Sequence, residues 1–216
     1  TVSGLVATLS PANITLDAQG GGSDVNIRNM IYAQDGNINV TAADSITQIS
    51  NIIQTGTGYI NLDANSGSIS MTNRSLTFNG DGNIRYDAGQ NVSVESLITS
   101  NGYISVTAGN NINQQSNIIS LADGTIDVDA NSGSITMKDG ALSVSGTGNI
   151  RYEAGQNVTV SSLIATQANV SVIALNGSIL DGGDSHPDVA AHKAQFSALN
   201  GGVGTVGVSA NALEIG

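Results

Sequence analysis

The chain has 216 residues, of which 27 are Gly, 39% are hydrophobic and only 11% are charged, with a net charge of −11. The acidic balance argues against nucleic acid as a partner, because phosphates are bound by clustered Lys and Arg. The absence of Cys excludes disulfides and thiolate metal sites. No apolar run approaches the roughly 18 residues of a membrane-spanning helix, so no membrane insertion is expected.

A repeat organises the chain from residue 36 onward, whereas residues 1–35 follow the same pattern less regularly. Residues 36–101 and 102–167 align without a gap and are identical at 37 of 66 positions. Shorter segments inside each unit are spaced by 22, 24 and 20 residues. These segments begin at Gly36, Gly58, Gly82, Gly102, Gly124, Gly148 and Ala168. A fixed period of this length is typical of solenoids, in which each repeat buries its apolar face against its neighbours.

Each segment contains three short strands with alternating apolar residues. The first strand is typified by Ile38-Val40-Ala42 and the second by Ile69-Met71. For the third strand, the inward residues are predicted to be Leu76-Phe78, Leu97-Ile98, Leu142-Val144 and Leu163-Ile164. Near the turns, Asn91, Asn111 and Asn157 are expected to form amide ladders between coils.

Three strands in roughly 22 residues describe one rung of a triangular coil. The predicted fold is therefore all-β, a right-handed parallel β-helix (solenoid) of about nine coils of 20–24 residues in a 66-residue super-repeat. The handedness is inferred from the right-handed rule for parallel crossovers. An antiparallel sandwich would also show frequent short strands, but it gives no reason for an unslipping 20/22/24 pattern.

The whole chain, 1–216, is predicted to be one β-helix segment of a longer solenoid. Regular coils are expected at 36–180, an insertion at 181–202, and a resumed coil at 203–216. Within the insertion, Pro187 and Gly201 predict a short helix over 188–199.

Several strings resemble the repeats of filamentous-haemagglutinin-type adhesins and related large exoproteins: AGQNVSV (88–94), AGNNI (108–112), NGSI (176–179) and FSALNGGVGTVGVSANALEI (196–215). The resemblance implies a right-handed β-helix exported by two-partner secretion in Gram-negative bacteria. The secretion domain of that family is not visible in this sequence.

Together, the repeat and the resemblance predict a non-catalytic structural shaft of a secreted bacterial surface adhesin or extracellular fibre. The expected partners are a protein or glycan on a host or neighbouring cell, or further copies of the chain end to end. Two alternatives stay open: a carbohydrate-binding module, and a β-helix polysaccharide lyase or hydrolase. The enzyme would need a unique cluster of Asp, Arg and Lys, yet the only lysines are Lys138 and Lys193.

The outward column beside the first strand gives weak metal-site candidates. It places Asp63 one rung from Asp87, and Asp129 one rung from Glu153, spacings at which carboxylates can bind Ca²⁺ or share a proton. Arg85 and Arg151 lie in the neighbouring column, and the cluster recurs with the repeat. We therefore favour charge balancing over catalysis, and no cofactor is expected.

Two further sets of residues are weighed in the same way. His186 and His192 are weak metal candidates, because they flank Pro187 and lie near Asp181. Tyr86 and Tyr152 are expected in the core, with hydroxyls that reach a turn. Tyr59 and Tyr103 are expected to point outward and to be too scattered for a sugar-stacking platform.

Overall fold

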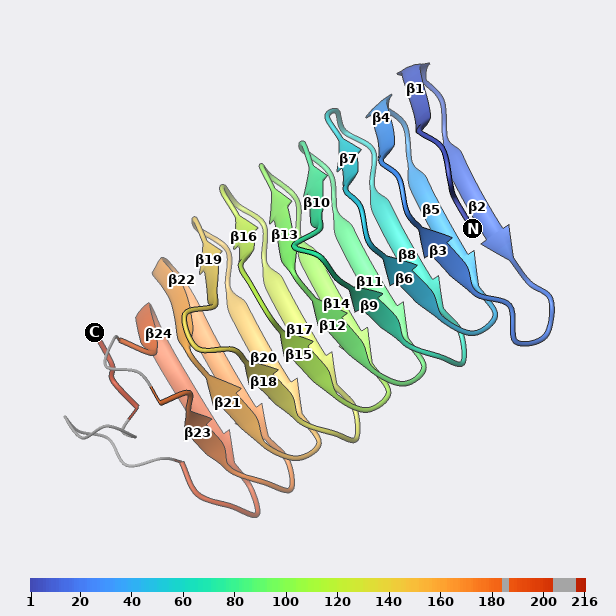
Figure 1. Ribbon diagram of the computed structural model, residues 1–216. Helices are drawn as coiled ribbons and strands as arrows, with labels where there is room; N and C mark the ends of the chain where they lie inside the picture. The colour runs from blue at the N-terminus through green and yellow to red at the C-terminus, as the bar shows by residue number, and fades with distance from the viewer. Residues whose placement is uncertain (184–186, 204–212) are drawn as a thin grey trace.

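The computed structural model describes residues 1–183, 187–203 and 213–216, and it confirms the right-handed parallel β-helix. Figure 1 shows the coils stacked along one direction, with β1 at one end of the stack and β24 at the other. The described residues make eight complete coils, and β24 (Val189–Ala198) begins a further coil on β22 (Ser162–Ala174). They contain no helix.

Three faces form the coil, and the strands of each face pair in parallel. Face 1 contains β2 (Ile14–Ala18), β5 (Ile38–Ala42), β8 (Ile60–Ala64), β11 (Ile84–Ala88), β14 (Ile104–Ala108), β17 (Ile126–Ala130) and β20 (Ile150–Ala154). Face 2 contains β3 (Val25–Ile27), β6 (Ile46–Gln48), β9 (Ile69–Met71), β12 (Val92–Val94), β15 (Ile112–Gln114), β18 (Ile135–Met137), β21 (Val158–Val160) and β23 (Ile179–Asp181). Face 3 contains β1 (Val6–Pro11), β4 (Ile31–Asp35), β7 (Ile52–Gln54), β10 (Leu76–Asn79), β13 (Ser96–Thr99), β16 (Ile118–Ser120) and β19 (Leu142–Ser145). Both β22 and β24 run from face 3 onto face 1.

Equivalent apolar residues stack directly over one another, as the repeat predicts. On face 1, Ile60, Ile84 and Ile104 are Cα partners in adjacent strands, and all three are fully buried. Because each rung covers the inward residues of the rung before it, the core is one continuous column. Burial of each Ile side chain contributes on the order of 2 kcal/mol.

Close contact between successive corners explains the glycines that begin the coils. A Cβ on Gly82 would lie 1.8 Å from the carbonyl oxygen of Gly58, and a Cβ on Gly102 would lie 1.9 Å from that of Gly82. No other residue fits these corners without a shift of the backbone. At the equivalent position Ala168 stands instead of Gly, and there β22 runs through the corner as one continuous strand.

A second corner, between faces 1 and 2, is linked by side-chain hydrogen bonds. The Oδ1 of Asn91 accepts from the backbone N of Asn111 at 3.1 Å, and Oδ1 of Asn111 accepts from the backbone N of Ser134 at 2.9 Å. Asn157 Oδ1 continues the ladder by accepting from the backbone N of Ser178 at 2.8 Å. The predicted ladder is therefore present, with serines alternating among the asparagines.

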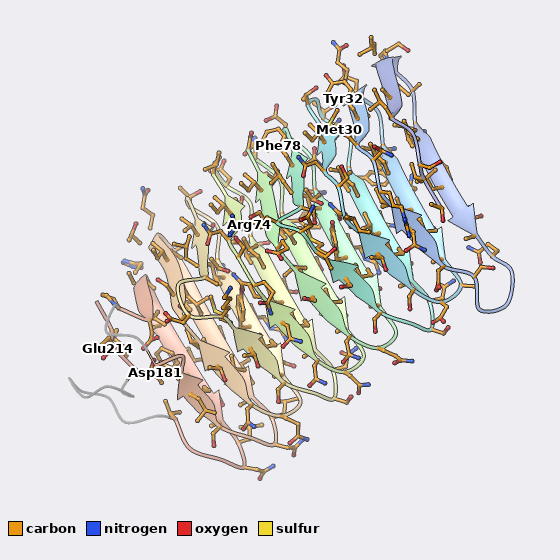
Figure 2. The ribbon with its side chains drawn as sticks, in the orientation of Figure 1. Met30, Tyr32, Arg74, Phe78, Asp181 and Glu214 are labelled. Atoms are coloured by element: carbon orange, nitrogen blue, oxygen red, sulfur yellow. The ribbon has the colours of Figure 1, made fainter. Side chains whose placement is uncertain are left out.

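The register predicted for face 3 is wrong in part. Leu97 and Leu163 are buried as expected, but Leu76, Phe78, Ile98, Leu142, Val144 and Ile164 lie on the outer, half-exposed side. Figure 2 labels Phe78 on β10. The inward positions of β10 and β19 are instead polar: Thr77, Asn79, Ser143 and Ser145. A slip of one residue moves every side chain of a strand to the opposite face.

Buried hydrogen-bond acceptors explain why polar side chains occupy the inside of face 3. Asn79 Nδ2 donates to the carbonyl of Gly58 at 3.0 Å, and Ser145 Oγ donates to that of Gly124 at 2.9 Å. These groups satisfy corner carbonyls that would otherwise be unpaired in the interior. The outward apolar side chains of face 3 therefore form a half-exposed stripe along the solenoid.

The helix predicted over 188–199 is also wrong. Val189–Ala198 form β24, which pairs in parallel with β22 so that Val172 faces Phe196 and Ala174 faces Ala198. Coil stacking thus continues within the segment assigned to an insertion, and the register shift between Ala165 and Asn169 absorbs the irregular length. Most of the predicted resumed coil lies outside the described residues.

Candidate functional site

The predicted acidic column on the outside of face 1 is present. Asp63 is the Cα partner of Asp87, and Asp129 is the Cα partner of Glu153, each pair from adjacent strands. Arg85 contacts both members of the first pair: its Nη1 lies 3.8 Å from Asp63 Oδ2 and its Nη2 pairs with Asp87.

Arg151 performs the same role one 66-residue unit later. Its Nη1 lies 2.8 Å from Asp127 Oδ1 and 3.6 Å from Asp129 Oδ2, and its Nη2 contacts Glu153. The two clusters differ only in that Asp127 stands where the first unit has Asn61, whose Oδ1 accepts from Arg85 at 3.1 Å.

Electrostatics in both clusters are those of partly shielded carboxylates with a shared cation. Partial burial raises the pKa of Asp63, Asp87 raises it further, and Arg85 opposes both effects. Burial likewise raises the pKa of Asp129, and here Arg151 is the main opposing influence. Because each cluster has its own guanidinium and occurs in both units, the arrangement balances charge along the rod and provides no single reactive site.

Two buried polar clusters lie inside the coil. Tyr86 Oη is 2.6 Å from Thr77 Oγ1 and donates to Gln48 Oε1 at 2.6 Å. Tyr86 is fully buried, and burial raises its pKa. Its hydroxyl does not reach a turn, as expected from the sequence; it bridges β6 on face 2 and β10 on face 3.

The second cluster repeats the first. Tyr152 Oη is 2.7 Å from Ser143 Oγ and donates to Gln114 Oε1 at 2.6 Å. Each tyrosine therefore connects all three faces of the coil from the inside, where no substrate has access.

A shallow surface depression lies over face 1. It has a volume of about 300 Å³, and Tyr59 and Tyr103 contribute to its lining together with Asn61, Asn83 and Arg85. The tyrosines are 42% and 47% exposed. Their strands, β8 and β14, are separated only by β11, so the prediction that the two rings are too scattered to form one surface is wrong.

A third acidic group, which the sequence analysis did not find, lies at the β24 end of the stack (Figure 2). Asp181, Asp188 and Glu214 each present a carboxylate oxygen, and the three oxygens lie within 4.8 Å of one another. Asp188 is fully buried, and burial together with its acidic neighbours raises its pKa to about 7. The nearby aspartates were noted in the sequence, but Glu214 is 33 residues from Asp181 and only the coil brings it into place.

The predicted histidine site is not assembled by the described residues. His192 is exposed on β24 and is not part of the acidic group. His186 lies outside the described residues.

Comparison with known proteins assigns no family to the chain. No family model matches it, and neither a curated protein nor a solved structure is similar to it. In the part of the chain that the structure describes, no helix is long and apolar enough to cross a membrane.

Proposed function

We propose that this chain is a non-catalytic shaft of a secreted bacterial surface adhesin or extracellular fibre. The observation that supports this function best is the exact recurrence of each polar cluster after 66 residues. An active site is needed once, whereas a shaft needs the same lateral and internal contacts in every unit.

Continuous ladders give the stiffness that such a shaft requires. The Ile column, the corner glycines and the Asn/Ser hydrogen bonds each link a rung to the next along the described coils. The acidic surface and the low content of Lys and Arg favour a soluble exported rod over one that binds nucleic acid.

The first test is a change of shaft length. Deleting residues 102–167 removes three rungs of about 4.8 Å each, so the rod should shorten by about 14 Å. We expect electron microscopy and small-angle scattering to show this shortening with the circular dichroism per residue unchanged. On cells that make the full-length protein, adhesion to partner cells should persist. Loss of adhesion despite intact folding and export would place the binding activity in this segment and contradict a purely structural role.

A second candidate, binding of a glycan, is favoured by the depression around Tyr59 and Tyr103. Two exposed aromatic rings about 10 Å apart, two rungs along face 1, can stack on alternate sugars of a chain. Asn61 and Asn83 supply hydrogen-bond donors and acceptors between them.

Glycan-array binding separates the two candidates. If face 1 binds glycan, Tyr59→Ala and Tyr103→Ala should each abolish the array signal, and Tyr32→Ala on face 3 should retain it. No glycan signal from the folded chain supports the shaft alone. Turnover of a polysaccharide that is lost in Arg85→Gln would contradict both candidates and favour the lyase or hydrolase.

A further inference from the structure

We propose that Asp181, Asp188 and Glu214 form a Ca²⁺ site that fastens the last described coils to one another. Asp181 ends β23 on face 2, and Asp188 directly precedes β24 on face 3. Glu214 belongs to the segment 213–216, whose Ile215 forms a parallel bridge with Val189. The three carboxylates thus come from three separate stretches of the chain.

Buried oxygens without partners distinguish this group from an ordinary acidic patch. Asp188 Oδ2 accepts from the backbone N of Glu214 at 2.9 Å, whereas its Oδ1 is buried and has no hydrogen-bond partner. Asp181 Oδ1 accepts from Gly183 N at 2.7 Å, and its Oδ2 is likewise buried and unpartnered. Glu214 Oε2 is the third such atom.

Unpaired carboxylate oxygens that converge in a buried place are strongly unfavourable unless a cation or a proton joins them. None of the ion pairs found among the described residues involves these three acids. The arrangement is therefore incomplete without a positive species at its centre.

The donor set and its spacing select a hard divalent cation, and Ca²⁺ in particular. Carboxylate oxygens alone suit Ca²⁺ or Mg²⁺ rather than Zn²⁺ or Cu²⁺. Two ligands of one Ca²⁺ can be at most about 4.8 Å apart, twice a bond of about 2.4 Å, and the three oxygens satisfy that limit. The shorter bonds and strict octahedron of Mg²⁺ fit a three-acid cage less well.

Backbone hydrogen bonds show what the ion would hold together. Val189 N donates to Glu214 O at 3.2 Å, and Gly216 N donates to Val189 O at 3.0 Å. Leu163 N, on the preceding coil, donates to Asp188 O at 2.7 Å. A bound ion would therefore reinforce the docking of residues 213–216 onto β24, and of β24 onto β22, through side chains.

Calorimetric titration of CaCl₂ into the chelator-treated protein at pH 8 tests the site. We expect one Ca²⁺ per chain, a melting temperature that rises with Ca²⁺ concentration, and weaker binding of Mg²⁺. Asp188→Asn should weaken Ca²⁺ binding by about tenfold or more. Asp139→Asn, an exposed acid on the β18–β19 turn, is the matched control and should bind Ca²⁺ like the unaltered chain.

Asp181→Asn is the second variant, because its amide oxygen can still accept from Gly183 N and its fold should persist. It should also lose Ca²⁺ affinity while keeping the circular dichroism of the unaltered chain. Absence of Ca²⁺ binding to the unaltered chain would overturn the site and leave a shared proton as the means of neutralisation. Unchanged binding in the folded Asp181→Asn variant, or Mg²⁺ binding as tight as Ca²⁺ binding, would also overturn it.

Discussion

Removal of the Tyr86 hydroxyl is the sharpest test of the polar interior. Tyr86→Phe keeps the ring, and therefore the packing, but deletes two buried hydrogen bonds, to Thr77 and to Gln48, each at 2.6 Å. A neutral buried hydrogen bond contributes about 1 kcal/mol, so the free energy of unfolding should fall by about 2 kcal/mol. The loss stays near this value because Gln48 Oε1 can still accept from Thr77 Oγ1, now at 3.3 Å.

Guanidinium unfolding followed by far-UV circular dichroism measures the effect, with an unchanged slope of free energy against denaturant. The 66-residue repeat provides an internal duplicate: Tyr152→Phe should cost the same within about 0.5 kcal/mol. Tyr59→Phe, which alters an exposed hydroxyl, is the control and should change stability by less than about 0.5 kcal/mol. The reasoning is refuted if Tyr86→Phe is as mild as Tyr59→Phe, or if the two repeat positions differ by more than about 1 kcal/mol.

Two further predictions concern the corners and the charged column. Gly102→Ala should destabilise the chain by about 3 kcal/mol in the same unfolding assay, because its Cβ meets a backbone oxygen, whereas Gly21→Ala, with nothing within 4 Å, should change it little; equal effects would contradict the corner contact. Arg85→Gln should lower the unfolding free energy by less than about 1 kcal/mol at pH 7, where Asp63 and Asp87 are both ionised. Because the folded-state pKa of Asp63 is raised, and loss of the guanidinium raises it further, the deficit should develop as pH rises from about 4 and vanish near pH 3. A deficit that grows as pH falls would exclude this explanation.

Much of the architecture could be predicted from sequence because the solenoid is built from nearest-neighbour contacts. The 20/22/24 spacing fixes which residues stack, and the alternation in strands such as Ile38–Ala42 fixes which side faces inward. The acidic pairs of face 1 follow from the same arithmetic, since Asp63 and Asp87 are one period apart.

The tertiary structure decided the features that depend on competition among neighbours or on distance across the coil. On face 3 hydrophobicity alone favours Phe78 inside, but the corner carbonyls and the Tyr86 hydroxyl require partners, so Thr77 and Asn79 take the inward positions. Their contribution is not visible to any pattern that counts only apolar residues.

The β24 end shows the same division between local pattern and global placement. Pro187 and Gly201 bound a segment that reads locally as a helix, but the open edge of β22 supplies a row of hydrogen-bond partners that favours a strand. The periodic sequence by itself determined the winding, the rung-to-rung register of faces 1 and 2, and the charged column. Only the closed coil determined the polar interior of face 3, the shared Tyr59–Tyr103 depression, and the meeting of Asp181, Asp188 and Glu214, because these contacts join residues that no fixed period relates.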